Sequence, residues 1–319
     1  MQEERAGRIE RIAIIGVGAV GSTTAYAMIQ AGAASELILA DLDRRRVEGE
    51  LMDLQHCLPF TDYMAITVAD VEEVTGCDLV IVTAGVAQQQ GESRLNLVQR
   101  NLAVFESFMP GLAERNPTAK FLIITNPVDI MTRVAAALTG LPDERVFGTG
   151  TVLDTARFRS LLSAHYGILP RHVHAYVIGE HGDSEVLVWS RAMIGPFHIS
   201  EYGELHQISM TPQDTERIGQ DVRQAAERII ERKGATHFAI GLAVVMLTDC
   251  LSRNLNAVMT VSRRVDDLYG LNEVCLSLPT LVCRQGAMTQ YELPLSGHER
   301  DELLKSAEIL DRVYRQLGL

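Results

Sequence analysis

The chain has 319 residues, of which 47% are hydrophobic, 22% are charged and 5% are aromatic. This composition is typical of a globular protein whose length allows about two domains. The 29 Lys and Arg residues and the 41 Asp and Glu residues give a net charge of −12. Because the chain is acidic and has no basic block, we expect neither nucleic acid nor an anionic membrane surface as a partner.

The first half of the chain alternates short apolar runs with helical patterns. Runs this apolar are expected of strands that are buried on both faces of a parallel sheet. Strands that alternate with helices predict a doubly wound α/β domain. The expected strands are 12–15, 37–40, 79–82, 121–125 and 146–148, and the expected helices are 19–31, 43–56, 96–115 and 130–139.

The second half mixes strands and helices less regularly, which predicts an α+β domain. The change in pattern near Gly150 divides the chain into two expected domains, 1–150 and 151–319. In the second domain we expect helices at 151–165, 211–233 and 236–252 and a final helix after 297, with strands at 173–178, 186–190, 258–262, 280–282 and 290–293.

The N-terminus and the cysteines indicate a cytoplasmic protein. The first 11 residues mix acidic and basic side chains and lead into no apolar stretch of signal-peptide type. The longest nearly apolar run, 238–247, is too short to cross a bilayer. The five Cys form no C-x-x-C pair, which favours reduced thiols, and no spacing of His and Cys predicts a metal site.

A glycine-rich loop follows the first expected strand and opens the first expected helix. Gly16, Gly18 and Gly21 have the G-x-G-x-x-G spacing that lets backbone approach a pyrophosphate at a helix N-terminus. Asp41 lies 20 residues after Gly21, where a carboxylate binds ribose hydroxyls and repels a 2′-phosphate. The pattern predicts NAD rather than NADP, and the alternative is an ordinary tight turn beside a surface carboxylate.

The loop from Gly85 to Arg94 contains two glycines and one arginine. From these residues alone, it is either a mobile lid or a surface loop with a solvated arginine.

Four segments together resemble the L-lactate dehydrogenase family, and their order and spacing match over essentially the whole chain. They are Gly91–Asn101, Thr125–Asp129, Leu153–Arg157 and Gly179–Ser184. The resemblance implies a Rossmann-type doubly wound parallel sheet followed by an α+β substrate domain. It also implies reversible hydride transfer between NADH and pyruvate, which gives L-lactate, with NAD as the cofactor.

The resemblance assigns catalytic or substrate-binding roles to four charged residues. His181 would give a proton to the ketone oxygen, and Asp154 would orient His181 and stabilise its charged form. Arg94, in the lid loop, would polarise the ketone oxygen. Arg157 would hold the substrate carboxylate through two parallel hydrogen bonds. Without the family, Asp154 and Arg157 could be a simple i, i+3 ion pair on a helix.

Gln88 occupies the position at which malate dehydrogenases, which resemble this pattern, place an arginine for a second carboxylate. Since residues 87–90 are all uncharged, that carboxylate would lack a partner here. We therefore expect pyruvate rather than oxaloacetate as the substrate. Asn126 and Thr236 match residues that complete the pocket, although each could instead cap a helix or form a turn.

The remaining implied contacts belong to an effector and to the cofactor. Arg159 and His174 match positions at which many bacterial members bind fructose 1,6-bisphosphate across a two-fold subunit contact, and these relatives also imply a homotetramer. Arg159 and His174 could instead be a helix-surface charge and an ordinary strand residue. The residues that match cofactor contacts are Gly16, Gly18, Val20, Gly21, Asp41, Arg46, Gly85, Val86, Ser107, Asn126 and Thr149.

Two other functions remain open on these residues. A malate dehydrogenase is disfavoured by Gln88. A non-catalytic NAD-binding protein could share the fold, because a fold does not fix a function. It is disfavoured by the intact set of Arg94, Asp154, Arg157 and His181.

Overall fold

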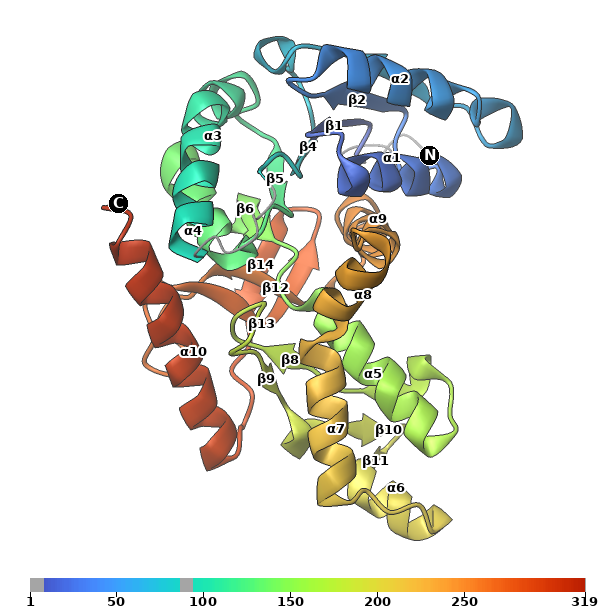
Figure 1. Cartoon of the computed structure of the whole chain (residues 1–319), viewed down its shortest axis with the longest axis vertical. Coiled ribbons are helices and arrows are strands. Elements are labelled where there is room, and N and C mark those ends of the chain that lie inside the picture. The colour runs from blue at the N-terminus through green and yellow to red at the C-terminus, as the bar shows by residue number, and fades with distance from the viewer. Residues whose placement is uncertain (1–8, 87–93, 319) are drawn as a thin grey trace.

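The computed structural model describes residues 9–86 and 94–318, apart from the side chain of Arg94. A large sheet runs through the middle of the molecule, and helices pack against both of its faces (Figure 1). The N-terminal half occupies the upper part of this view, and most of the C-terminal half lies below it.

Six parallel strands form the N-terminal part of the sheet, in the order β3-β2-β1-β4-β5-β6. This order is that of a doubly wound dinucleotide-binding sheet, in which the winding direction reverses between β1 and β4. The strands are β1 Arg11–Ile15, β2 Glu36–Ala40, β3 Ala65–Val68, β4 Leu79–Val82, β5 Lys120–Ile123 and β6 Val146–Gly148.

Four helices cover the two faces of these strands. Along β1 the side chains alternate between the faces: Ile12 and Ile14 pack into the apolar cluster that contains α1, and Ala13 and Ile15 pack into the cluster that contains α3 and α4. Both faces of the strand are therefore buried, as its apolar sequence predicts. The helices are α1 Ala19–Ala31, α2 Arg44–Gln55, α3 Arg94–Arg115 and α4 Val128–Thr139.

Three antiparallel strands from the C-terminal half extend the same sheet to nine strands. They are β12 Ala257–Arg264, β13 Cys275–Cys283 and β14 Gly286–Gln290. The connection to the N-terminal strands is the pairing of Ser262 on β12 with Gly148 on β6. The sheet is therefore continuous across residue 150, which the sequence pattern did not predict.

The other C-terminal elements surround this extension. Their strands form a three-stranded sheet, β11-β10-β7, and a pair, β8-β9. The strands are β7 Val173–His174, β8 Val177–Ile178, β9 Val186–Leu187, β10 Met193–Ile194 and β11 Phe197–His198. The helices are α5 Val152–Tyr166, α6 Ile199–His206, α7 Pro212–Arg223, α8 Ala225–Lys233, α9 Phe238–Arg253 and α10 Gly297–Arg315. Single 3-10 turns lie at Leu58–Phe60, Val71–Glu73, Asp143–Arg145, Pro170–His172 and Trp189–Arg191.

Several expected elements differ from the observed ones. The helix expected at 211–233 is two helices, because the backbone leaves the helix at Gln224, where no Gly or Pro marks a break. The strand expected at 173–178 is two strands, because the chain changes its pairing partner from β10 to β9. The strand expected at 290–293 lies earlier in the chain, at Gly286–Gln290, and overlaps the expected range only at Gln290. Strands β3, β10 and β11 and helix α6 were not expected, and all are short.

Among the described residues, no helix has both the length and the apolar composition that crossing a bilayer requires.

Candidate active site

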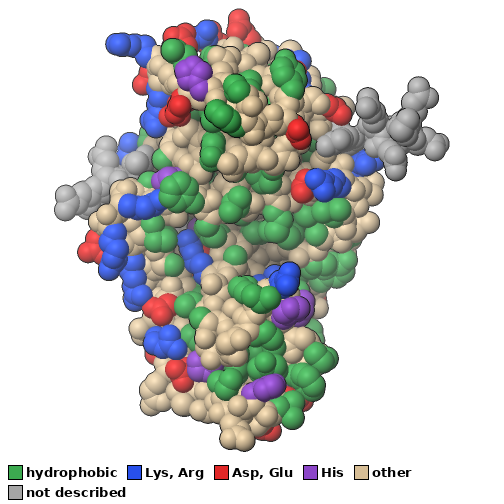
Figure 2. Space-filling view, turned by 90° about the vertical axis from the view of Figure 1, so that its right-hand side faces the viewer, with side chains coloured by type: hydrophobic (Ala, Val, Ile, Leu, Met, Phe, Trp, Pro, Cys, Tyr) green, Lys and Arg blue, Asp and Glu red, His purple; other side chains and the backbone are tan. Residues whose placement is uncertain are grey.

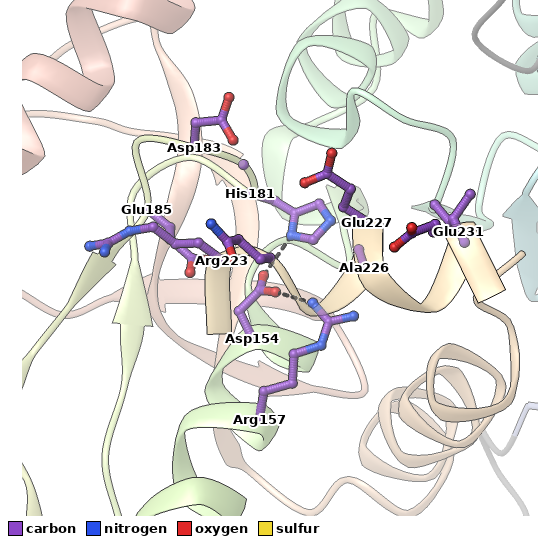
Figure 3. A pocket seen from close by; sticks show the side chains of 12 residues that line it. Asp154, Arg157, His181, Asp183, Glu185, Arg223, Ala226, Glu227 and Glu231 are labelled. Atoms are coloured by element: carbon purple, nitrogen blue, oxygen red, sulfur yellow. Dashed lines mark hydrogen bonds and ion pairs between the residues drawn. The ribbon is translucent and has the colours of Figure 1, made fainter. Parts of the chain in front are cut away.

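A cavity of about 800 Å³ opens between α5, the loop after β8, and the ends of α7 and α8 that meet at Gln224. It brings together three residues that the sequence predicts to be catalytic or substrate-binding, and Figure 3 shows their side chains in one cluster. The lining residues are Asp154, Arg157, His181, Gly182, Asp183, Glu185, Arg223, Gln224, Ala226, Glu227, Ile230 and Glu231.

His181 and Asp154 form a hydrogen bond of 2.5 Å between Nδ1 and Oδ2. Asp154 lies in the first turn of α5, and its side chain is only 2% exposed. The His181 side chain is 24% exposed, so one edge of the ring reaches the cavity. Because Nδ1 is bound to the carboxylate, Nε2 is the nitrogen that is left for a ligand.

The carboxylate changes the proton affinity of the imidazole. Burial by itself lowers the pKa of His181, but the negative charge and hydrogen bond of Asp154 outweigh burial and raise the pKa to about 9. Burial likewise raises the pKa of Asp154, and the positive charges of His181 and Arg157 reverse this effect and lower it. At neutral pH, His181 is therefore protonated and Asp154 is ionised.

Arg157 binds the other oxygen of the same carboxylate, with 2.6 Å between Nη1 and Oδ1. Asp154 thus lies between the imidazole and the guanidinium (Figure 3). The i, i+3 ion pair that the spacing predicts is present, and it also belongs to the cavity. One donor of the guanidinium is used in this contact, and a planar carboxylate could be bound by the rest of the fork.

Asp129 positions the backbone of His181, a role that the sequence alone did not assign. Its carboxylate is 1% exposed, and it accepts a hydrogen bond of 2.7 Å from the His181 N–H. Burial raises the pKa of Asp129 to about 6. Its segment, Thr125–Asp129, was one of the motifs, so the signal was present, but the contact joins residues 52 positions apart.

Glu185 is a second residue that sequence reasoning missed. It follows His181 in the same loop, lines the cavity and is 4% exposed.

A second cavity of about 500 Å³ lies at the carboxyl ends of β1, β2 and β4. In open α/β sheets, this crevice at the switch in strand order is the place where nucleotides bind. Seven of the predicted cofactor residues line it, namely Gly16, Gly18, Asp41, Arg46, Gly85, Val86 and Ser107.

The three glycines of the loop differ in what a side chain would meet. A Cβ on Gly16, whose φ is +92°, would lie 2.5 Å from the Ala84 nitrogen, and a Cβ on Gly21 would lie 2.1 Å from the Gly16 carbonyl oxygen. These two glycines are required by the fold. A Cβ on Gly18 would meet nothing within 4 Å. The open space beside Gly18, at the N-cap of α1, fits a pyrophosphate that approaches the backbone closely.

Asp41 is held in place at the end of β2. Its carboxylate accepts hydrogen bonds from the backbone of Val17, at 2.6 Å, and of Asp43, at 3.0 Å. The first bond ties the carboxylate to the glycine-rich loop, so the two parts of the predicted dinucleotide signature lie against each other.

Other predicted residues lie outside the lining of both cavities. Thr149 is buried and donates its N–H to Ile123, and Asn126 is exposed, with its carbonyl bound by Asn101. Val20 and Gly21 belong to α1, and Thr236 lies between α8 and α9. Gln88 and the side chain of Arg94 lie outside the described residues.

The two predicted effector residues are close to each other. The Arg159 Nε donates to the carbonyl of Ala175, the residue after His174, at 2.9 Å. His174 is exposed on β7. The guanidinium of Arg159 also lies over the Tyr176 ring, 5.2 Å from its centroid.

Both halves of the chain match models of one protein family. Residues 10–148 match the NAD binding domain of lactate/malate dehydrogenase, and residues 151–316 match the alpha/beta C-terminal domain. The chain belongs to the lactate/malate dehydrogenase family.

Relatives within this family are similar over nearly their whole length. The L-lactate dehydrogenase of Synechococcus sp. (strain JA-3-3Ab) is 47% identical over 300 residues, which cover 94% of this chain and 97% of the relative. That of Thermus aquaticus is 45% identical over 308 residues, or 97% and 99% of the two chains.

Solved structures of the family have the same fold. A lactate dehydrogenase from a Medee basin deep-sea metagenome library superposes with a TM-score of 0.94 at 36% identity and covers 98% of this chain and 100% of its own. The minor L-lactate dehydrogenase from Enterococcus mundtii gives 0.92 at 34% identity, with 97% and 98% covered. The predicted family, the Rossmann-type fold class, NAD as the cofactor and the activity of an NAD-dependent L-lactate dehydrogenase are confirmed by these matches.

Proposed function

We propose that this dehydrogenase reduces pyruvate to L-lactate in the cavity of His181 and that His181 is its acid and base. The observation that carries this proposal is the 2.5 Å hydrogen bond to Asp154, which leaves Nε2 facing the cavity. NADH, when bound, supplies a hydride to the carbonyl carbon. His181 gives its Nε2 proton to the ketone oxygen, and in the reverse direction it takes the hydroxyl proton of lactate.

The substrate carboxylate binds Arg157 in this proposal. Arg157 is 15% exposed and is fixed by Asp154, so little side-chain freedom remains to be lost when a carboxylate binds. Because Asp154 contacts both cations, it sets the distance between the group that binds the substrate and the group that protonates it. Arg94, Gln88, Asn126 and Thr236 complete the pocket by their match to the family.

The cofactor binds along the second cavity. The open space at Gly18 receives the pyrophosphate, and Asp41 receives the adenosine ribose. We assign residues 1–150 to the NAD-binding domain and 151–319 to the substrate domain, and the family matches at 10–148 and 151–316 support this division. We place the enzyme in the cytoplasm, which agrees with its five free cysteines.

We also propose a homotetramer, and the exposed face of α9 supports one of its contacts. Phe238, Leu242 and Met246 follow each other every four residues and are 68%, 66% and 45% exposed. Tyr26, on the adjacent α1, is 45% exposed. Figure 2 shows hydrophobic side chains gathered across the middle of the side of the molecule on which α1 and α9 lie. A continuous apolar surface of this kind is typical of a subunit contact.

Fructose 1,6-bisphosphate is the proposed activator, bound by Arg159 and His174. The two residues lie on neighbouring elements of one face, and a two-fold axis would bring two of each together. Two guanidinium groups and two imidazole rings around one axis suit a ligand with two phosphates.

The test is NADH oxidation with pyruvate and with oxaloacetate, each with and without fructose 1,6-bisphosphate. A higher kcat/KM for pyruvate and a lower pyruvate KM with the bisphosphate are expected. Preference for oxaloacetate would replace the proposal with a malate dehydrogenase. No oxidation with either ketoacid would leave the family fold without this activity. An unchanged KM and assembly state with the bisphosphate would remove the effector site.

A further inference from the structure

Glu185 places a carboxylate inside the wall of the catalytic cavity without a hydrogen-bond partner. The residue is 4% exposed, and its Oε1 is buried with no donor within reach. Leaving an ionised carboxylate unpaired in such a place costs several kcal/mol. Burial and the negative charge of Asp154 therefore raise the pKa of Glu185 to about 8, so the group is largely protonated at neutral pH.

Arg223 is an unpaired cation on the same cavity wall. It is the last residue of α7, is exposed, and takes part in none of the ion pairs of α7 in the described part of the chain. Its positive charge acts on Glu185 and lowers the pKa that burial raises. Figure 3 shows Glu185 and Arg223 on the same side of Asp154 and His181, whereas Glu227 and Glu231 lie on the other side.

Helix α8, which begins after Gln224, forms one side of the cavity and is loosely packed. None of its nine residues is buried, and Ile230 is 48% exposed although its side chain is apolar. Ala226 and Ile230 both line the cavity. A helix whose apolar side chains face an open cavity gains contacts only when that cavity is filled, so its position is weakly fixed beforehand.

We propose that Glu185 and Arg223 are a positioning pair: when α8 packs against bound pyruvate, the Arg223 guanidinium approaches Glu185, which then gives up its proton to solvent, and the resulting ion pair holds the start of α8 against the substrate. This inference rests on the proposed function. The contact gives both the buried carboxyl group and the unpaired cation a partner, and it links the loop of His181 to the junction of α7 and α8.

The other charged groups of the wall do not serve Glu185 in the same way. The cations His181 and Arg157 are already bound to Asp154. The acidic groups can only repel an ionised Glu185. The groups of the wall besides Glu185 are Asp154 and Arg157 on α5, His181 and Asp183 in the loop, Arg223 on α7, and Glu227 and Glu231 on α8. Since the pair needs ionised Glu185, its contribution to substrate affinity is present at high pH and is lost as the pH falls.

The first experiment is a set of variants assayed for pyruvate reduction with saturating NADH. We expect Glu185→Gln and Arg223→Gln each to raise the pyruvate KM by about tenfold, because a lost ion pair of this kind is worth on the order of one factor of ten in affinity. The pyruvate KM of the double variant is expected to be no higher than the higher of the two single-variant values. Arg223→Lys is expected to keep the pyruvate KM close to that of the unsubstituted chain.

The matched control is Arg217→Gln on the same helix, where Arg217 pairs with Asp214 and Asp221 away from the cavity. We expect its KM to stay at the value of the unsubstituted chain. A KM that Arg223→Gln leaves unchanged, or effects of the two single variants that multiply in the double variant, would overturn the pair.

A second measurement follows the proton itself. Oxamate, a pyruvate analogue that is not reduced, is titrated into the NADH complex by calorimetry in buffers of different ionisation enthalpy near pH 7.5. The unsubstituted chain is expected to release a proton that Glu185→Gln does not release, and equal proton counts for both would overturn the proposal. Absence of pyruvate reduction by the unsubstituted chain would instead overturn the proposed function, whatever the pair does.

Discussion

Asp154 is a buried carboxylate that lies between two cations, and this position makes it the most sensitive single residue of the site. Its two oxygens bind His181 at 2.5 Å and Arg157 at 2.6 Å. Replacement by Asn removes the charge and keeps the shape. We expect Asp154→Asn to lower kcat/KM for pyruvate by about 10³-fold, because a charged partner lost from a buried network costs about 3–5 kcal/mol. Binding of NADH, measured by fluorescence, is expected to change little, because Asp154 is outside the cofactor cavity.

Asp249→Asn is the control for this variant, since Asp249 is partly exposed and pairs with Arg253 on α9, away from the lining of the catalytic cavity. Turnover of Asp154→Asn at the rate of the unsubstituted chain would remove Asp154 from the mechanism.

The proton on His181 predicts opposite pH profiles for the two directions of the reaction. Pyruvate reduction needs the charged imidazole, and lactate oxidation needs the neutral one. Because Asp154 raises the pKa of His181 to about 9, kcat/KM for pyruvate is expected to be flat near neutral pH and to fall as the pH rises through about 9. The value for lactate is expected to rise over the same range. Initial rates from pH 6 to 10 in both directions measure this, and a midpoint near 6.5 in both would show that Asp154 has no such effect.

For single residues of the site, the family motifs predicted which side chains are functional, but their contacts could be seen only in the structure. His181 and Asp154 are 27 positions apart, and no periodicity in the sequence joins them. Asp129 and Glu185 both lay in or beside recognised motifs, but their roles depend on burial and on which neighbours they meet. Burial of a single acidic side chain cannot be predicted from one sequence, because acidic residues are usually exposed.

The glycine-rich turn between β1 and α1 contains glycines of two kinds: Gly16 and Gly21 are required by the fold, and Gly18 leaves space for a ligand. We expect Gly18→Ala to weaken NADH binding by about tenfold or more while it lowers the free energy of unfolding by no more than about 1 kcal/mol, because the added Cβ enters space that only a ligand would use. We expect Gly21→Ala to destabilise the protein by about 1–3 kcal/mol or more, because its Cβ would meet the Gly16 carbonyl at 2.1 Å.

Thermal unfolding and NADH titration of the two variants check this prediction together. The assignment of Gly18 to the pyrophosphate would be wrong if Gly18→Ala bound NADH as tightly as the unsubstituted chain.

Elements with a strong internal pattern were predicted closely, and elements defined by tertiary pairing were not. The helix expected at 19–31 has these bounds in the structure, because its sequence is mostly apolar and the left-handed Gly32 cap ends it. Strands β7 to β11 have two residues each and exist only where another segment lies beside them. The break at Gln224 also has no local cause in the sequence, and it lies where α7 and α8 meet the cavity.

Across the whole molecule, one continuous sheet joins the two halves that the sequence pattern separates. Strands β12 to β14 come after residue 250 and still extend the N-terminal sheet past β6. The loop of His181 is tied to this extension by hydrogen bonds between Gly179 and Ser277 on β13, at 2.8 and 2.9 Å. The proton donor and the cofactor cavity are therefore fixed to the same sheet, which suits a reaction that needs both groups at set distances.

The exposed apolar face of α9 predicts that the chain assembles into an oligomer through this helix. Burial of a Leu side chain contributes about 1.5–3 kcal/mol, and a two-fold contact repeats each substitution on both subunits. Leu242 is 66% exposed in the single chain and lies at the centre of the row formed with Phe238 and Met246. We therefore expect Leu242→Glu to split the assembly into smaller species, since it removes the apolar contact and adds a charge that would be buried without a partner.

Sedimentation velocity over a range of concentrations measures the species directly, with Arg217→Gln on α7, outside the exposed face of α9, as the control. The unsubstituted chain is expected to sediment as a tetramer, and its unfolding temperature is expected to rise with concentration, because association stabilises the folded chain. A tetramer of unchanged size in Leu242→Glu would place the contacts on other faces. A monomer in the unsubstituted chain would contradict the assembly itself, and with it the two-fold site that Arg159 and His174 need in order to bind a bisphosphate between subunits.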